Sequence, residues 1–192
     1  QQGMDQMMAD IVSMGGELFV MDDGWFGDKY PRKNDSSSLG DWVVDKNKLP
    51  NGIEGLLSDA KKHGVKFGIW IEPEMANTTS ELYEKHPDWV LKASERDVVL
   101  GRGGTQVVLD LANPAVQDFV FGVVDNLMTS YPEIDYIKWD ANMSVQNHGS
   151  QYLTKDNQSH MYIEFHRGFE KICQRIRAKY PDLTIQACAS GG

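Results

Sequence analysis

Short apolar runs alternate along this sequence with longer segments of helical periodicity, and this alternation limits the possible folds more than any other feature. Five runs have the pattern of strands, at residues 17–21, 66–71, 107–111, 135–139 and 184–189. Most are almost continuously apolar, as strands are when both faces of a parallel sheet are covered. Helices are predicted between them, at residues 5–14, 53–63, 115–130 and 161–180. This order predicts an α/β protein built from βα units.

Every predicted strand ends in polar residues. They are Asp22 and Asp23, Glu72 and Glu74, Asp110, Asp140 and Asn142, and Cys188 and Ser190. A (β/α)8 TIM barrel places its active site at the C-terminal ends of all its strands, whereas a doubly wound sheet concentrates ligands at one switch point. Polar residues at five strand ends therefore favour the barrel. Because such a barrel needs about 250 residues, residues 1–192 are expected to form part of a single barrel domain.

Composition narrows the classes of function. Hydrophobic residues make up 41% of the chain and the net charge is −9, which suits one globular core and disfavours nucleic acid as a partner. No apolar stretch approaches the roughly 18 residues of a membrane-spanning helix. We therefore expect a soluble protein with no membrane partner, in a compartment that the sequence leaves unknown. Cys173 and Cys188 have no metal-ligand spacing and are expected to be free thiols.

The segment YIKWDAN, residues 136–142, carries the clearest chemical signal. Side chains alternate along a strand, so Lys138, Asp140 and Asn142 share one face. An ammonium group beside Asp140 would favour the ionised carboxylate that a nucleophile requires. The alternative is a buried Lys–Asp pair with a purely structural role.

Two further motifs suit sugar recognition. In FVMDDGWFGD the carboxylates of Asp22 and Asp23 precede aromatic residues, although one of them could instead cap a turn or the pair could bind a metal. In GIWIEPEM, Trp70, Glu72 and Glu74 are predicted to share one face as the wall of a polyol pocket. Core packing of Trp70 and ion pairing of the two glutamates are the alternatives.

Two later segments are weaker candidates. Arg102 lies in a glycine-rich loop and could reach the site, but its glycines do not follow the phosphate-binding pattern. Cys188 shares a strand face with Gln186 and Ser190, and the glycines that follow would let a ligand approach the backbone. Catalysis by Cys188 is disfavoured, because none of the five histidines falls at another strand end.

Six motifs in a fixed order resemble glycoside hydrolase family 36, the bacterial α-galactosidases. They are FVMDDGWFG, SSLGDW, GIWIEPEM, ELYEKHPDW, YIKWDAN and CASGG, and they extend over the whole chain. The resemblance implies a TIM barrel, of which this chain would supply about strands 2–6 of eight, without the family's flanking β-rich domains. It also implies that Asp140 is the nucleophile. The implied substrate-binding residues are Asp22, Asp23, Trp70, Arg102, Lys138, Asn142, Cys188 and Gly191, with the aspartate pair holding the galactose 4- and 6-hydroxyls.

The resemblance implies a retaining α-galactosidase that acts on melibiose- or raffinose-type oligosaccharides without a metal or cofactor. The family's acid/base is an aspartate in a motif resembling SDNTD, which this chain does not contain, so residues 1–192 alone are expected to be inactive. Four alternatives stay open at this point: an α-N-acetylgalactosaminidase, a galactosyl-transferring enzyme, a metal-dependent barrel enzyme that uses Asp22, Glu72, Asp110 and Asp140, and a non-catalytic sugar-binding module. A homo-oligomeric parent enzyme is also left open.

Overall fold

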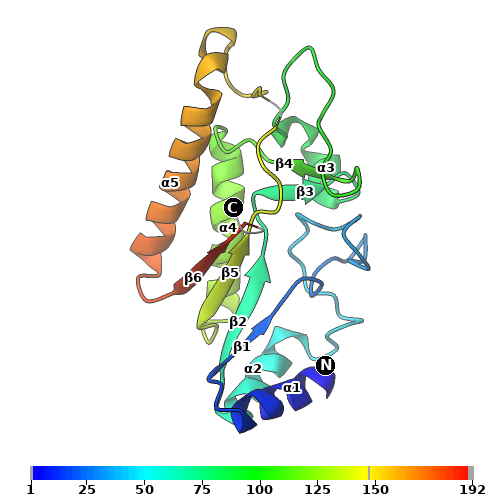
Figure 1. Ribbon diagram of the computed structural model, residues 1–192, viewed down its shortest axis with the longest axis vertical. Coiled ribbons are helices and arrows are strands. Elements are labelled where there is room, and N and C mark those ends of the chain that lie inside the picture. The colour runs from blue at the N-terminus through cyan, green and yellow to red at the C-terminus, as the bar shows by residue number, and fades with distance from the viewer. Residues whose placement is uncertain (1, 147, 190–192) are drawn as a thin grey trace.

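A four-stranded parallel sheet forms the centre of the computed structural model, which describes residues 2–146 and 148–189 (Figure 1). Its strands are β1 (Leu18–Met21), β2 (Lys66–Ile71), β5 (Tyr136–Asp140) and β6 (Thr184–Cys188). They lie side by side in the order β1-β2-β5-β6, which is their order along the chain. A doubly wound sheet reverses this order at its switch point, whereas a barrel keeps it. The predicted α/β fold, a partial (β/α)8 barrel, is confirmed.

Helices precede or connect these strands. They are α1 (Gln2–Ser13), α2 (Gly52–His63), α4 (Pro114–Ser130) and α5 (Met161–Lys179). Local signals define their ends: the Asn113 side chain accepts a hydrogen bond from the Ala115 amide at the start of α4, and Gly64 ends α2 with φ at 70°, where a Cβ atom would be strained. α1 packs against α2, and α4 packs against α5 (Figure 1). None of the described helices has both the length and the apolar content needed to cross a bilayer.

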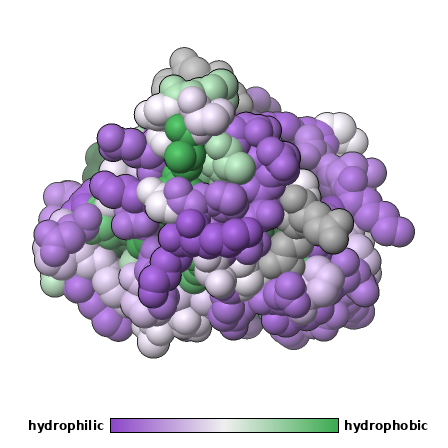
Figure 2. Space-filling model, turned by 90° about the horizontal axis from the view of Figure 1, so that it is seen from below, coloured by the Kyte–Doolittle hydropathy of each residue, from purple (hydrophilic) through white to green (hydrophobic). Residues whose placement is uncertain are grey.

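The parallel sheet has two unlike faces. Ile137 and Trp139 point toward the helices, where the Trp139 ring meets the edge of Phe169 on α5 with centroids 6.0 Å apart. Lys138 and Asp140 alternate with them and point to the other face, which is the interior side of a barrel. Seen from below, the surface is mostly hydrophilic with smaller apolar patches (Figure 2).

A second, smaller sheet corrects one prediction. β3 (Met75–Asn77) and β4 (Gln106–Val108) pair antiparallel beyond the C-terminal ends of the barrel strands (Figure 1). The segment 107–111, predicted as a parallel strand, therefore lies outside the parallel sheet, which has four strands instead of five. Its apolar side chains are buried by β3 and by a bridge between Leu109 and Val90. A short apolar run predicts burial but does not specify the partner strand.

The remaining short helices lie in the connections. They are α3 (Glu81–Lys85) and η1 (Pro87–Trp89), between the two strands of the small sheet, and η2 (Lys155–His160), which leads directly into α5. The Ser80 side chain caps α3 by accepting a hydrogen bond from the Tyr83 amide. The long connection between β1 and α2 contains no helix or extended strand, and its residues 27–40 reach the small sheet through side-chain contacts described below.

Candidate active site

The parallel register brings five predicted site residues to one end of the sheet. Trp70 of β2 lies opposite Lys138 of β5, and Asp140 of β5 lies opposite Cys188 of β6. Asp22 directly follows β1, and its Oδ2 accepts a hydrogen bond from Lys138 Nζ at 2.6 Å. Residues that are up to 166 positions apart in the sequence thus meet around the tip of β5.

Asp140 is almost buried, with 7% of its surface exposed. Trp70 Nε1 donates to Oδ2 at 3.1 Å, and the Ala141 amide donates to Oδ1 at 2.9 Å. Burial alone would raise the pKa of Asp140, but hydrogen bonds from Asn142, Trp70, Ala141 and Cys188 outweigh it and hold this pKa below its ordinary value. Asp140 is therefore ionised at neutral pH, which is the state that nucleophilic attack requires.

Lys138 has a different partner from the one predicted. Its ammonium group forms an ion pair with Asp22, and this contact raises the pKa of Lys138. The ionised state of Asp140 rests instead on neutral donors, Trp70 and Asn142 first among them. The predicted attraction between Lys138 and Asp140 is present, but the neutral donors contribute more to the lowered pKa of Asp140. Lys138 still contributes a positive charge near Asp140.

The sequence predicts Glu72 in the wall of a polyol pocket, in an ion pair or, in the metal alternative, among the ligands. It is 2% exposed, and its Oε1 accepts a hydrogen bond from the Asn142 amide at 2.6 Å. Burial raises the pKa of Glu72 to about 7. Hydrogen bonds from Asn142 lower this pKa, and the negative charge of Asp140 raises it further. Glu72 thus supports the backbone of the segment that follows Asp140, and it binds a proton near neutral pH.

Glu74 does not share a face with Glu72, contrary to the prediction. β2 ends at Ile71, so the strand alternation does not extend to Glu74. The carboxylate of Glu74 accepts a hydrogen bond from Trp139 Nε1 at 2.7 Å, on the side of the sheet that faces the helices. Burial raises the pKa of Glu74. Glu74 therefore belongs to the packing between the sheet and α5.

Asp23 lies in the connection after β1 and is held by a buried arginine that the sequence did not single out. Arg32 Nε donates to Asp23 Oδ1 at 3.0 Å, and Arg32 Nη2 donates to Oδ2 at 2.7 Å. Arg32 is 3% exposed. In the sequence it is one basic residue in a polar loop, so no local pattern could have identified it.

Arg102 contacts the same connection through Asp35. Its backbone adopts a positive φ of 46° in the loop that leads into β4, and its Nη1 donates to Asp35 Oδ2 at 3.1 Å. Arg32 also contacts Asp35, at 3.4 Å. Two predicted binding residues, Asp23 and Arg102, are thus connected through Arg32 and Asp35.

The comparisons with known proteins assign the family. The sequence profile of the Melibiase family matches residues 1–192. The chain belongs to the melibiase family. This match, with structural neighbours described as GH36 α-galactosidases, confirms the resemblance that the six motifs predicted.

Relatives of this melibiase-family chain cover nearly all of it. A probable α-galactosidase C of Aspergillus flavus is 40% identical over 97% of the chain, and the α-galactosidase AgaA of Geobacillus stearothermophilus is 40% identical over 94%. Each alignment covers 24% of the relative. A crystal structure of an AgaA variant in complex with raffinose matches 100% of this chain and 26% of its own, with a TM-score of 0.92 and 36% identity. The chain therefore spans about a quarter of the length of these relatives.

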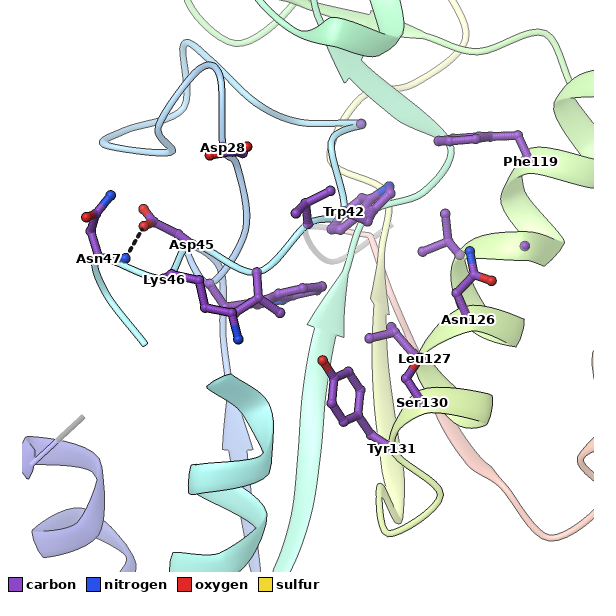
Figure 3. Close-up of a pocket in the computed structure, with 16 residues that line it drawn as sticks. Asp28, Trp42, Asp45, Lys46, Asn47, Phe119, Asn126, Leu127, Ser130 and Tyr131 are labelled. Carbon is purple, nitrogen blue, oxygen red and sulfur yellow. Dashed lines mark hydrogen bonds between the residues drawn. The ribbon is translucent and has the colours of Figure 1, made fainter. Parts of the chain in front are cut away.

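The melibiase-family chain also has a cavity of about 710 Å³ that is separate from these strand ends. It lies between the connection that contains Trp42, Asp45 and Lys46 and the side of α4 that carries Phe119 and Asn126 (Figure 3). None of the predicted site residues lines it. Because its lining lacks Asp140 and the groups that bind Asp140, the proposed chemistry is placed at the strand ends instead of in this cavity.

The carboxylates of the metal alternative do not converge in this melibiase-family chain. Asp110 is completely buried, and it accepts hydrogen bonds from the Ser150 hydroxyl and from the Ala112 amide. Within residues 2–146 and 148–189, no three His, Cys, Asp or Glu side chains are arranged to hold a metal ion. Both cysteines, Cys173 and Cys188, are free thiols, as predicted. The predicted site residue Gly191 lies outside the described residues.

Proposed function

We propose that residues 1–192 are the nucleophile-bearing part of a retaining α-galactosidase and belong to a single catalytic barrel domain. The observation that carries this proposal is the ionised, hydrogen-bonded Asp140 at a strand end, with Trp70 Nε1 3.1 Å from its Oδ2. Relatives named α-galactosidases, and a solved relative in complex with raffinose, support galactose-containing oligosaccharides as the substrates. The proposed reaction removes terminal α-linked galactose from melibiose- or raffinose-type sugars.

In this reaction Asp140 attacks the anomeric carbon while an acid/base carboxyl protonates the departing glycosidic oxygen. The resulting galactosyl ester is then hydrolysed by a water molecule that the same acid/base deprotonates, which gives net retention. Retaining enzymes hold these two carboxyl groups about 5 Å apart. Glu72 does not fit the acid/base role, because it is buried and bonded to the Asn142 amide. We assign that role to an aspartate outside residues 1–192, so this segment alone is expected to be inactive.

Substrate recognition is assigned to groups around Asp140. Asp22 and Asp23 are proposed to accept hydrogen bonds from the galactose 4- and 6-hydroxyls, because carboxylates bind sugar hydroxyls strongly. Further contacts with the sugar are proposed for Trp70, Arg102, Lys138, Asn142, Cys188 and Gly191. The reaction needs carboxyl groups and water and uses no metal or organic cofactor. A neutral sugar also suits a chain of net charge −9. Neither a nucleic acid nor a membrane is proposed as a partner. A homo-oligomer of the full-length enzyme is compatible with this proposal.

The test is Asp140→Ala in the full-length protein, assayed with an aryl α-galactoside. We expect kcat to fall by at least about a thousandfold, because loss of a covalent nucleophile removes a large share of the transition-state stabilisation. Added azide should restore turnover and give β-galactosyl azide, since the small anion can attack the face that the shortened nucleophile leaves open. Full activity of the variant would overturn the proposal. A strong preference of the wild type for an α-N-acetylgalactosaminide would replace the substrate assignment.

A further inference from the structure

We propose that Arg32 is a positioning residue that fixes the Asp23 carboxylate for recognition of galactose hydroxyls. The inference rests on the proposed function, because it assigns a purpose to the orientation of Asp23. Arg32 and Asp23 both belong to the connection between β1 and α2, which contains neither a helix nor an extended strand. In such a segment, the side-chain contacts determine where a carboxylate points.

All five N–H donors of Arg32 have an acceptor. Nε and one Nη2 hydrogen bind the two oxygens of Asp23, at 3.0 and 2.7 Å. Nη1 donates to the Ser37 carbonyl and to Asn77 Oδ1, both at 3.0 Å, and Nη2 also reaches Asp35 Oδ1 at 3.4 Å. The planar guanidinium group has no further donor to offer. Its orientation is therefore fixed, and a two-point pair transfers that orientation to Asp23.

The support behind Arg32 comes from the small antiparallel sheet. Asn77 on β3 is completely buried, and besides Arg32 it binds the Leu39 amide and the Asp35 carbonyl. The Phe26 ring lies 5.6 Å from the guanidinium carbon of Arg32. The small sheet thus holds Arg32 in place although it contributes no residue to the proposed chemistry.

The geometry leaves Asp23 able to bind a ligand. A carboxylate has about four acceptor positions, and Arg32 occupies two of them. The side chain of Asp23 is 30% exposed, whereas that of Arg32 is 2% exposed. The free positions therefore lie on the accessible side of the carboxylate, where they can accept hydrogen bonds from sugar hydroxyls.

The experiment compares aryl α-galactosides that lack single hydroxyls, using the full-length protein. For the wild type, kcat/KM should fall when the 4- or the 6-hydroxyl is removed. In Arg32→Lys, which keeps the charge but cannot form the two-point pair, the penalty for removing one of these hydroxyls should shrink by about tenfold or more. The penalty for removing the 2-hydroxyl should stay unchanged. Lys33→Ala, an exposed cation of the same segment, is the matched control and should behave as the wild type.

A role limited to stability would lower kcat/KM for all the sugars by one common factor, and that result would overturn the inference. If Arg32→Lys does not fold, the paired variant Arg32→Gln/Asp23→Asn keeps a hydrogen-bonded pair without a buried charge. In this paired variant, removing the 4- or the 6-hydroxyl should lower kcat/KM by the same factor as in Asp23→Asn alone, because Arg32 acts through Asp23. A difference of more than about threefold between these two variants would also refute the inference. Failure of the wild type to cleave any α-galactoside would count against the proposed function instead.

Discussion

The strand ends and the connection between β1 and α2 both present carboxylates, but they hold them in different ways. At the strand ends, Asp140 and Glu72 are bound by neutral donors, and the two pKa values move in opposite directions. In the connection, Asp23 and Asp35 are bound by guanidinium groups. Strand register supplies backbone and indole donors at fixed positions, whereas Asp23 and Asp35 of the irregular connection depend on charged side chains. We therefore expect the strand ends to respond to pH and the connection to respond to loss of single charged groups.

The largest effect on stability should come from Arg32→Met. This change leaves Asp23 without its guanidinium partner and removes one of the two donors to Asn77 Oδ1, so it should cost about 3–5 kcal/mol, as for other broken buried ion pairs. Lys138→Met, the matched change at the strand ends, should cost about 1 kcal/mol or less, because the Asp22 side chain is 59% exposed. Hydrogen exchange of the backbone amides of residues 22–51 in the full-length protein measures the loss of stability in Arg32→Met. Equal protection of these residues in the two variants would remove the contrast between the regions.

The next largest effect is the dependence of stability on pH that Glu72 causes. Its pKa is raised from 4.5 to about 7, so the folded state binds an extra proton between these pH values and loses stability as the pH rises through them. The full change corresponds to roughly 3 kcal/mol. In Glu72→Gln this decline should disappear, so the variant should gain stability relative to the wild type from pH 4.5 to 7. Parallel unfolding midpoints for the two proteins across this range would contradict the assignment.

Trp70→Phe should have a smaller effect, on activity. It removes the hydrogen bond to Asp140 Oδ2, and a hydrogen bond to a charged group contributes about 1.5–3 kcal/mol. Because this bond lowers the pKa of Asp140, the acidic limb of the kcat/KM profile should move to higher pH. The profile of the full-length enzyme measures the shift. An unmoved acidic limb would mean that Trp70 does not control the charge of Asp140.

The smallest effect is predicted for Asp35→Asn. The pair of Asp35 with Arg102 is exposed, with 53% and 38% of the two side chains accessible, so its loss should cost no more than about 1 kcal/mol and should be screened by salt. Unfolding at low and high ionic strength tests this. A loss greater than that of Arg32→Met would show that Asp35, and not Asp23, is the principal partner of Arg32.

Local signals in the sequence predicted most of the secondary structure. The helix expected at residues 53–63 is Gly52–His63, and the strand expected at 66–71 is Lys66–Ile71. Capping residues and apolar periodicity act within a few positions, so they are readable without a fold. The prediction for residues 107–111 is wrong because an apolar run is equally suited to antiparallel pairing with β3. Asp140, Asp22 and Trp70 were also accessible to sequence reasoning, since alternation along each strand places them at its polar end.

The sequence by itself determined where the strands and helices lie and which polar residues stand at the strand ends, because these depend on neighbours along the chain. The tertiary structure alone decided the partner of each charge. Lys138 pairs with Asp22, 116 positions away, and Arg32 binds Asn77, 45 positions away. Such pairings depend on how the strands align and where the irregular connection docks. Several carboxylates could compete for each cation in the unfolded chain, and only the packed backbone brings one of them within hydrogen-bonding distance.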